Sequence, residues 1–201
     1  MIKKFLFIPI IFLISICGGE DADVTETNES VENIVNSSVE EPTIDLITAV
    51  IENDLDTVNQ HIAYGSDLNL QDGTFSNTPL NFAGIYGLTD IANALVDAGA
   101  DLNLINDDNF TPLCNAAAWG HTSVVTILLD AGADLSAKCF ETQIGVSVSL
   151  SIAIGAPYSD YIKGLYVDHG EKYNIPYDET KIIDGREKVI ELLRNLSLIH
   201  I

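Results

Sequence analysis

The stretch TPLNFAGIYG at residues 78–87 returns as TPLCNAAAWG at residues 111–120, 33 residues later. A second stretch, LVDAGADLN at residues 95–103, returns as LLDAGADLS at residues 128–136 with the same spacing. A fixed period of about 20 to 50 residues is typical of a solenoid, in which each unit buries its apolar face against its neighbours. We therefore expect a stack of repeated units with an extended surface rather than an enclosed catalytic pocket.

Each of the two clear units carries the signals of a helix pair. Thr78 and Thr111 are suited to cap a first helix, because a proline follows each of them at the position where a missing N–H costs nothing. Glycines predict where the helices end: Gly87 and Gly120 after the first helix, Gly99 and Gly132 after the second. The second helix carries one apolar stripe, made of Ile91, Ala92, Leu95 and Val96, then of Val124, Val125, Leu128 and Leu129.

The 33-residue period, the TPL segment and the AGAD segment together resemble the ankyrin repeat. The resemblance implies a mainly α solenoid of helix-turn-helix pairs with hairpin tips, about four repeats long. We expect the ankyrin-repeat domain over residues 43–201, divided into repeats at 43–71, 72–105, 106–138 and a degenerate 139–174, then a C-terminal cap at 175–201. Terminal repeats expose one face, and His61 accordingly stands where Leu95 and Leu128 stand.

The outer units match this pattern less well. In the first unit Asn53 and Gly65 stand where Gly87 and Gly99 stand. In the degenerate unit Gly170 is expected to end a helix, and four residues are expected at buried positions: Ala153, Ile162, Tyr166 and Val167. The cap is expected as a helix over residues 184–196, with one apolar face made of Val189, Ile190 and Leu193.

The chain begins with MIKKFLFIPIIFLISIC, residues 1–17. Two lysines precede an apolar stretch at residues 5–16, which as a helix would cover only about 18 Å of a hydrocarbon core about 30 Å thick. This pattern favours a secretory signal peptide at residues 1–16 over a membrane-spanning helix.

The residues before Cys17, Ile-Ser-Ile, resemble a bacterial lipobox, although Ile16 is larger than the usual residue at its position. The resemblance implies lipidation of Cys17, with residues 17–42 as an acidic disordered tether. It also implies an exported protein, anchored at the bacterial outer membrane or on a periplasmic face. Ordinary signal cleavage, which would leave a soluble periplasmic protein, and an uncleaved anchor remain the alternatives.

The formal net charge is −21, and loss of residues 1–16 removes two lysines and no acidic residue, which leaves −23. A protein with this much negative charge repels phosphate backbones and anionic lipid headgroups. We therefore expect neither nucleic-acid binding nor peripheral membrane binding. A basic partner surface would be attracted. The alternative is that the acidity serves only solubility.

We find no sequence motif of an enzyme, a metal site or a cofactor site. The chain lacks the nucleophile, zinc-protease and phosphate-loop motifs, and its four histidines lie outside any of them. The segment at residues 101–109 is rich in oxygen-bearing side chains but does not follow the spacing of a calcium-binding loop. We expect its Asp and Asn residues to form turns instead. Cys114 and Cys139 are expected to be ordinary thiols, with a disulfide as the alternative in an exported protein.

Partners of ankyrin solenoids commonly contact the hairpin tips and the concave face of the first helices. Transferred to this chain, those positions are Glu52, Thr74, Phe75, Asn77, Ile85, Tyr86, Asp107, Asp108, Phe110, Ala118 and Trp119. Aromatic residues ringed by polar ones are typical of binding hot spots, and Tyr86 and Trp119 are the expected anchors. For Phe75 and Phe110, local packing across the hairpins is an equal alternative.

These features predict a monomeric, non-enzymatic recognition module that binds a basic protein partner. An envelope accessory protein and an immunity-type inhibitor of an exported toxin both fit this class. A haem or small-molecule carrier that assists a periplasmic enzyme is the alternative from a different class.

Overall fold

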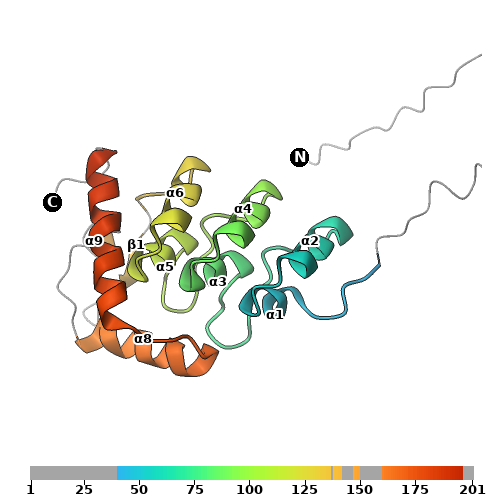
Figure 1. The fold of residues 1–201 in the computed structure, drawn as a ribbon, viewed down its shortest axis with the longest axis horizontal. Helices are drawn as coiled ribbons and strands as arrows, with labels where there is room; N and C mark the ends of the chain where they lie inside the picture. Colours follow the sequence, from blue (N-terminus) through green and yellow to red (C-terminus); the bar gives the residue numbers. More distant parts are fainter. Residues whose placement is uncertain (1–39, 137, 142–146, 150–159, 197–201) are drawn as a thin grey trace, which may run out of the picture. The chain divides into compact units, whose positions relative to one another are not determined.

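The computed structural model describes residues 40–136, 138–141, 147–149 and 160–196 (Figure 1). In this part of the chain, six short helices form three consecutive pairs. The pairs are α1 (Leu46–Ile51) with α2 (Leu55–Tyr64), α3 (Pro79–Tyr86) with α4 (Thr89–Asp97), and α5 (Pro112–Ala118) with α6 (Thr122–Asp130). The first helices of the pairs stack side by side, and so do the second helices. The predicted mainly α repeat solenoid is thereby confirmed.

The first helices begin at side-chain caps. Thr78 and Thr111 each accept a hydrogen bond from the N–H three residues further on, at 3.1 and 3.2 Å, and a proline follows each threonine as predicted. The first unit lacks the Thr-Pro pair, and Asp45 replaces it. Its carboxylate accepts hydrogen bonds from the Thr48 N–H at 2.9 Å and the Thr48 hydroxyl at 2.6 Å. Asp45 therefore caps the first helix of its unit as Thr78 and Thr111 cap theirs.

The helices end in left-handed turns at the predicted residues. Gly87, Gly99, Gly120 and Gly132 have positive φ, between 72° and 89°. After the first of these, the Leu88 N–H donates to the Ala83 carbonyl at 3.0 Å, and the same bond closes the other turns. In the first unit Asn53 takes this position with φ 57°, which is tolerable because asparagine is among the few non-glycine residues that adopt it.

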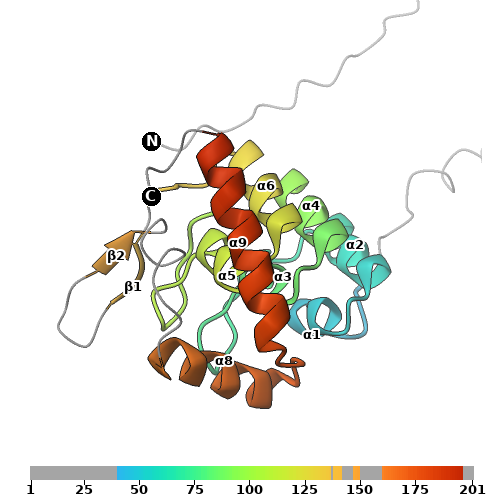
Figure 2. The same ribbon diagram turned by 60° about the vertical axis from the view of Figure 1, so that its left-hand side comes forward.

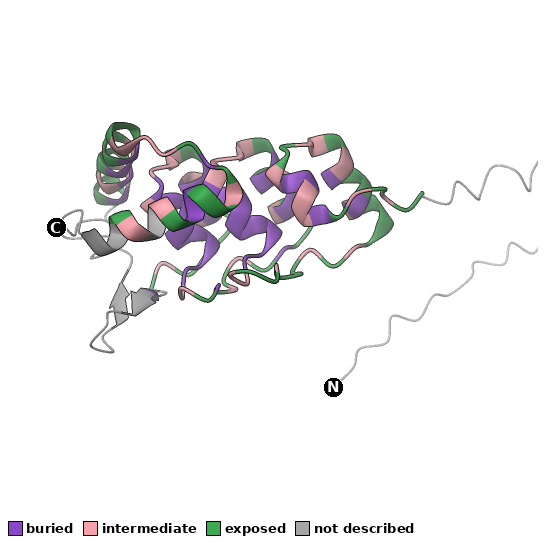
Figure 3. Cartoon of the chain, turned by 90° about the horizontal axis from the view of Figure 1, so that it is seen from below, coloured by how far each residue is buried: buried purple, intermediate pink, exposed green. Residues whose placement is uncertain are grey.

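The core lies between the two rows of helices (Figure 3). The central helix α3 is buried from Pro79 to Ile85. The predicted stripes on α4 and α6 are buried at Ile91, Ala92, Leu95, Val124, Val125 and Leu128, while Val96 and Leu129 are half-buried. Burial of one such side chain contributes roughly 1.5 to 3 kcal/mol. The repeated pattern thus supplies the main stabilising term.

At the N-terminal end, His61 replaces the leucine of the inner units and is itself 8% exposed. Its Nε2 donates to the Ile44 carbonyl at 2.8 Å, and its Nδ1 lies 2.8 Å from the Ser66 hydroxyl. Because both ring nitrogens have partners, the polar ring is buried without an unpaired group. His61 therefore ties the segment before α1 to the end of α2.

The expected fourth repeat has a different structure. Strand β1 (Lys138–Glu141) lies in the expected hairpin region, but it pairs antiparallel with β2 (Ser147–Ser149), which stands where the first helix of the pair is expected. One helix, α8 (Asp160–Tyr173), follows among the described residues. Alternating serine and valine in β2 favour a strand over a helix. Of the four residues expected at buried positions, Val167 is half-buried, Ala153 lies outside the described residues, and so do the side chains of Ile162 and Tyr166.

Helix α8 also continues past Gly170, which was expected to end it. The helix runs to Tyr173, and Asn174 makes the left-handed turn with φ 53°. The Ile175 N–H then donates to the Gly170 carbonyl at 2.9 Å. A Cβ at Gly170 would lie 3.2 Å from the Ile175 carbonyl oxygen, so the glycine allows the chain to fold back closely.

The last helix, α9 (Glu179–Asn195), packs against α5 and α6 (Figure 2). It begins five residues earlier than expected. Its buried residues are Ile182, Arg186, Val189 and Leu193, while Ile190 is half-buried. Gly185 meets Gly120 backbone to backbone, since a Cβ at Gly185 would lie 2.5 Å from the Gly120 carbonyl oxygen.

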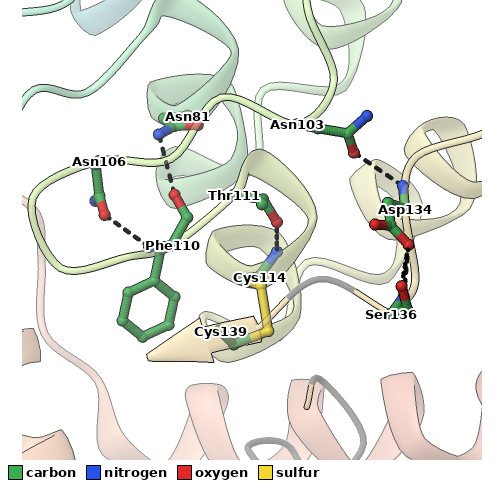
Figure 4. The surroundings of a disulfide bond; sticks show 9 residues. All are labelled: Asn81, Asn103, Asn106, Phe110, Thr111, Cys114, Asp134, Ser136 and Cys139. Atoms are coloured by element: carbon green, nitrogen blue, oxygen red, sulfur yellow. Dashed lines mark hydrogen bonds between the residues drawn. A yellow bond between two sulfur atoms is a disulfide. The ribbon is translucent and has the colours of Figure 1, made fainter. Parts of the chain in front are cut away.

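A disulfide joins Cys114 on α5 to Cys139 on β1, with a Cα–Cα distance of 5.3 Å (Figure 4). The expectation of two ordinary thiols is therefore wrong. The sequence spacing of 25 residues could not supply the distance, which depends on where the fold places β1 relative to α5. Closing a loop of this length contributes roughly 3 to 4 kcal/mol in the chain-entropy description.

Candidate partner-binding site

The eleven residues expected to contact a partner differ widely in exposure. Three are exposed: Glu52, Thr74 and Asp107. Four are half-buried: Phe75, Tyr86, Asp108 and Ala118. Four are buried: Asn77, Ile85, Phe110 and Trp119. The inner face, meaning the row of α1, α3 and α5 with the tip loops at residues 71–77 and 105–110, is thus less open than the sequence implies.

The cover is the C-terminal part of the same chain. Helix α8 lies across the tip loops and the lower ends of the first helices (Figures 1 and 3). Two residues near its C-terminal end, His169 and Tyr173, contact six residues of the inner face through their side chains and the Tyr173 carbonyl: Asp72, Phe75, Asn77, Phe82, Tyr86 and Asp108. We call these six residues the α8 seat.

Tyr173 is the centre of these contacts. Its hydroxyl donates to the Asp72 carboxylate at 3.0 Å and lies 3.4 Å from the donating Nδ2 of Asn77. Its backbone carbonyl accepts a hydrogen bond from the Tyr86 hydroxyl at 2.7 Å. The ring stands edge-on to Phe82, with centroids 4.9 Å apart, which is a favourable arrangement for two aromatic rings.

Burial raises the pKa of Tyr86 to about 12 and raises that of Tyr173 as well. Both phenols therefore keep their protons at neutral pH and remain hydrogen-bond donors. This protonation state is the one that the acceptors require, since a carboxylate and a carbonyl can only accept.

His169 occupies the second position, one helical turn before Tyr173. Its ring stacks on Phe75 with centroids 4.6 Å apart and planes inclined by 18°. Its Nε2 lies 3.5 Å from the Asp108 Oδ2. Burial raises the pKa of the Asp108 carboxyl, His169 opposes that shift, and Asp107 and Asp168 add to it. Asp108 is therefore a carboxylate in a setting that disfavours its charge.

Asp72 and Asn106 shape the two tip loops. The Asp72 carboxylate accepts hydrogen bonds from the N–H groups of Thr74, Phe75 and Asn77, and the Asn106 amide oxygen accepts from those of Asp108 and Phe110. Asn106 also donates to the Asn77 side chain at 2.9 Å, which joins the loops. Residues 101–109 thus form turns, as the sequence indicates. Asp72 was not expected as a site residue from the sequence, because an aspartate in a turn is explained by its hydrogen bonds to the loop and gives no sign of a contact with Tyr173.

Trp119 is not one of the six residues of the α8 seat, although it lies near Tyr86, which is. It stands at the end of α5 and lines a cleft of about 380 Å³ together with Tyr86, His121 and the segment around residues 175–182. Lys181 and Asp178 are the charged residues of its wall. The structure thus places the two expected anchors differently: Tyr86 donates to the Tyr173 carbonyl, and Trp119 is buried at the wall of the cleft.

The described histidines have structural partners. The His121 Nε2 donates to the Ile85 carbonyl at 3.0 Å, and burial lowers the pKa of this ring, which keeps it neutral. In the described part of the chain, no group of three or more His, Cys, Asp or Glu residues is arranged to hold a metal ion. No described helix is both long and apolar enough to span a membrane.

Comparison with known families agrees with the geometry. A family model for ankyrin repeats matches residues 46–139 in three copies, which are the three helix pairs from α1 to α6. These three helix pairs are ankyrin repeats. Ankyrin repeats are protein-interaction modules and are generally not enzymes. The match ends at residue 139, within β1, so the described elements β2, α8 and α9 lie outside the matched repeats. No curated protein matches the chain significantly.

Proposed function

We propose that this ankyrin-repeat protein is an exported recognition module, anchored through a lipid on Cys17, that binds a basic protein partner at its inner face and tip loops. The observation that carries the proposal is the chemistry of the two tips. Asp107 and Thr74 are exposed there, directly beside the aromatic residues of the α8 seat. Exposed carboxylates around apolar anchors favour a partner with basic residues around its own contact surface.

Export is supported by two independent features. Residues 1–16 have the pattern of a secretory signal, and Cys17 follows them in a lipobox-like context. The Cys114–Cys139 disulfide fits an oxidising compartment, because cytosolic reductants keep most thiols reduced. The acidic segment at residues 17–42 would then hold the repeats away from the membrane.

Two roles within this class remain open: an envelope accessory protein and an immunity-type inhibitor of an exported toxin. Both need a basic partner, and they differ in its source. The partner of an accessory protein comes from the same cell, whereas a toxin comes from another cell.

Capture of the partner by the full chain tests the proposal. The chain, expressed with its own N-terminus and a C-terminal tag, is exposed to envelope extract and to medium from competing cells. Asp107→Lys reverses an exposed tip charge, and Asp97→Lys reverses an exposed charge on α4 as the matched control. We expect a basic protein that is retained by the wild type and Asp97→Lys, lost by Asp107→Lys, and released by salt. Equal retention by both variants would exclude the tips.

Lipid attachment has its own test. Labelled fatty acid is expected on the wild-type chain and not on Cys17→Ser, and only the wild type should fractionate with membranes. Membrane fractionation of Cys17→Ser, with no label on the wild type, would reject the anchor.

The cleft beside Trp119 favours a second candidate, a small-molecule or haem carrier, because its volume of about 380 Å³ lies within the range of ligand pockets. A Soret shift on haem titration would support the haem form of this role. A spectrum of free haem throughout the titration would remove it.

A further inference from the structure

Helix α8 occupies part of the surface that an ankyrin partner would contact, and it does so through two side chains one helical turn apart. Tyr173 fills the space between Phe82 and Phe75, and its hydroxyl meets Asp72 and Asn77. One turn earlier, His169 covers Phe75 and faces Asp108. The seat therefore recognises an aromatic hydroxyl and a nitrogen base spaced four residues apart on a helix.

The charge of α8 does not suit this seat. The helix carries three acidic residues, Asp160, Asp168 and Glu171, against two lysines. Asp168 opposes ionisation of Asp108, as Asp107 does. Among the described residues, the Asp108 Oδ2 has no hydrogen-bond partner, and the His169 Nε2 at 3.5 Å is too distant to be one. A helix with a cation at this position and no acidic neighbours would match the carboxylates better.

Helix α8 is also weakened by its own sequence. Gly164 and Gly170 both lie in its interior, where glycine is less favourable than alanine. Gly170 is needed for the fold-back of the chain, but a Cβ at Gly164 would meet nothing within 4 Å. Packing therefore does not require Gly164, and its effect is to lower the stability of the helix.

We propose that α8 is a displaceable occupant of the seat, and that the partner displaces it with a basic helical segment carrying a tyrosine four residues after an arginine or lysine. This inference rests on the proposed function and names the chemistry of its partner. The cation would lie over Phe75 and pair with Asp108, a geometry that combines a cation–π contact with an ion pair. The tyrosine would take the Asp72 and Asn77 contacts of Tyr173. Such binding of an apolar helix face to a preformed surface is a common mode of peptide recognition.

The test uses a labelled peptide with the sequence of residues 160–173 that carries His169→Arg, Asp160→Gln, Asp168→Gln and Glu171→Gln. Its binding to the full-length protein is measured by fluorescence anisotropy. We expect this basic peptide to bind. The unmodified peptide, and the basic peptide that also carries Tyr173→Ala, should each bind at least tenfold more weakly than the basic peptide.

Protein variants then separate displacement from binding elsewhere. His169→Ala/Tyr173→Ala empties the seat and should bind the basic peptide at least tenfold more tightly than wild type. Gly164→Ala stabilises α8 without changing a residue of the seat. Because the peptide would have to displace a more stable helix, this variant should bind the basic peptide about fivefold more weakly than wild type, as expected from the glycine-to-alanine difference in a helix. Gly164→Ala also keeps the test valid should the double variant fail to fold.

Equal peptide affinity for all three proteins, or no binding even to a folded double variant, would overturn the displacement model. The captured partner distinguishes the two proposals. A partner that is lost by Asp107→Lys and unaffected by Gly164→Ala would leave the proposed function standing and reject the role of α8. A partner that binds Gly164→Ala more weakly than wild type would support both.

Discussion

The repeats at residues 46–130 and the C-terminal region at residues 138–196 are built by different means. In the repeats, the first helix of each pair begins at a side-chain cap, the helices end in left-handed turns, and each unit packs on the next one along the chain. In the C-terminal region, the decisive contacts are distant in sequence: Tyr173 meets Asp72 across 101 residues, and a disulfide ties β1 to α5. The repeats make the scaffold, and the C-terminal region decides how much of its surface stays open.

The largest expected effect breaks the repeats themselves. Leu95→Ala removes a fully buried side chain on α4, the second helix of the central pair, and should lower the free energy of unfolding by about 2 to 5 kcal/mol. Urea denaturation followed by circular dichroism measures it. Leu70→Ala, at a residue that is 49% exposed, is the control and should change stability by less than about 0.5 kcal/mol. Similar losses for both variants would contradict the assigned core.

The second prediction concerns the covalent link between the two regions. Cys114→Ala/Cys139→Ala should lower the free energy of unfolding by about 3 to 4 kcal/mol, because the unfolded chain is no longer constrained by the loop. Thermal melts of wild type with and without reductant should show the same loss, while reductant should leave the double variant unchanged. A wild-type melt that is insensitive to reductant would mean that the bridge does not form.

A third, smaller effect tests the seam between α9 and the repeats. Gly185→Ala places a Cβ against the Gly120 backbone and should destabilise the protein by about 1 to 3 kcal/mol. Gly164→Ala is the matched control within a helix, since its Cβ meets nothing, and should stabilise by up to about 1 kcal/mol. Opposite signs of the two shifts in Tm would confirm the close crossing, whereas equal signs would contradict it.

The smallest effect is a contrast in pH dependence between two carboxyls. Hydrogen bonds from Thr48 lower the pKa of Asp45 below the ordinary value of 3.8. Its contribution to stability is therefore fully present above pH 3.8 and is lost as the pH falls below that value. Burial raises the pKa of Asp108 above the ordinary value of 3.8. Its contribution to stability is therefore fully present below pH 3.8 and is lost as the pH rises above that value. Melting curves from pH 3.5 to 7 should show Asp108→Asn gaining stability relative to wild type with rising pH, and Asp45→Asn losing it. Parallel curves would reject both assignments.

The repeats could be predicted from the sequence because their determinants are local. Thr78 and Pro79 start a helix, and Gly87 ends it, whatever surrounds them. The C-terminal region misled the same reasoning. Gly170 has the spacing of a helix end, yet it serves the fold-back after α8, because Asn174 makes the turn instead. Nothing local marks Tyr173 as a contact of Asp72.

For the candidate site, residue type was predictable but accessibility was not. The tips do carry Thr74 and Asp107 at the surface, and the aromatic residues do gather on the inner face. Trp119 and Phe110 are nevertheless buried, since exposure depends on the packed fold as a whole.

The sequence by itself determined the repeat, its period, its helix boundaries and the acidic, aromatic character of the inner face, because caps, turns and apolar spacing act over a few residues. The tertiary structure alone decided the Cys114–Cys139 bridge, the crossing of Gly185 over Gly120 and the seating of His169 and Tyr173 on the inner face. These depend on distances between segments far apart in the chain, which only the packed fold brings together.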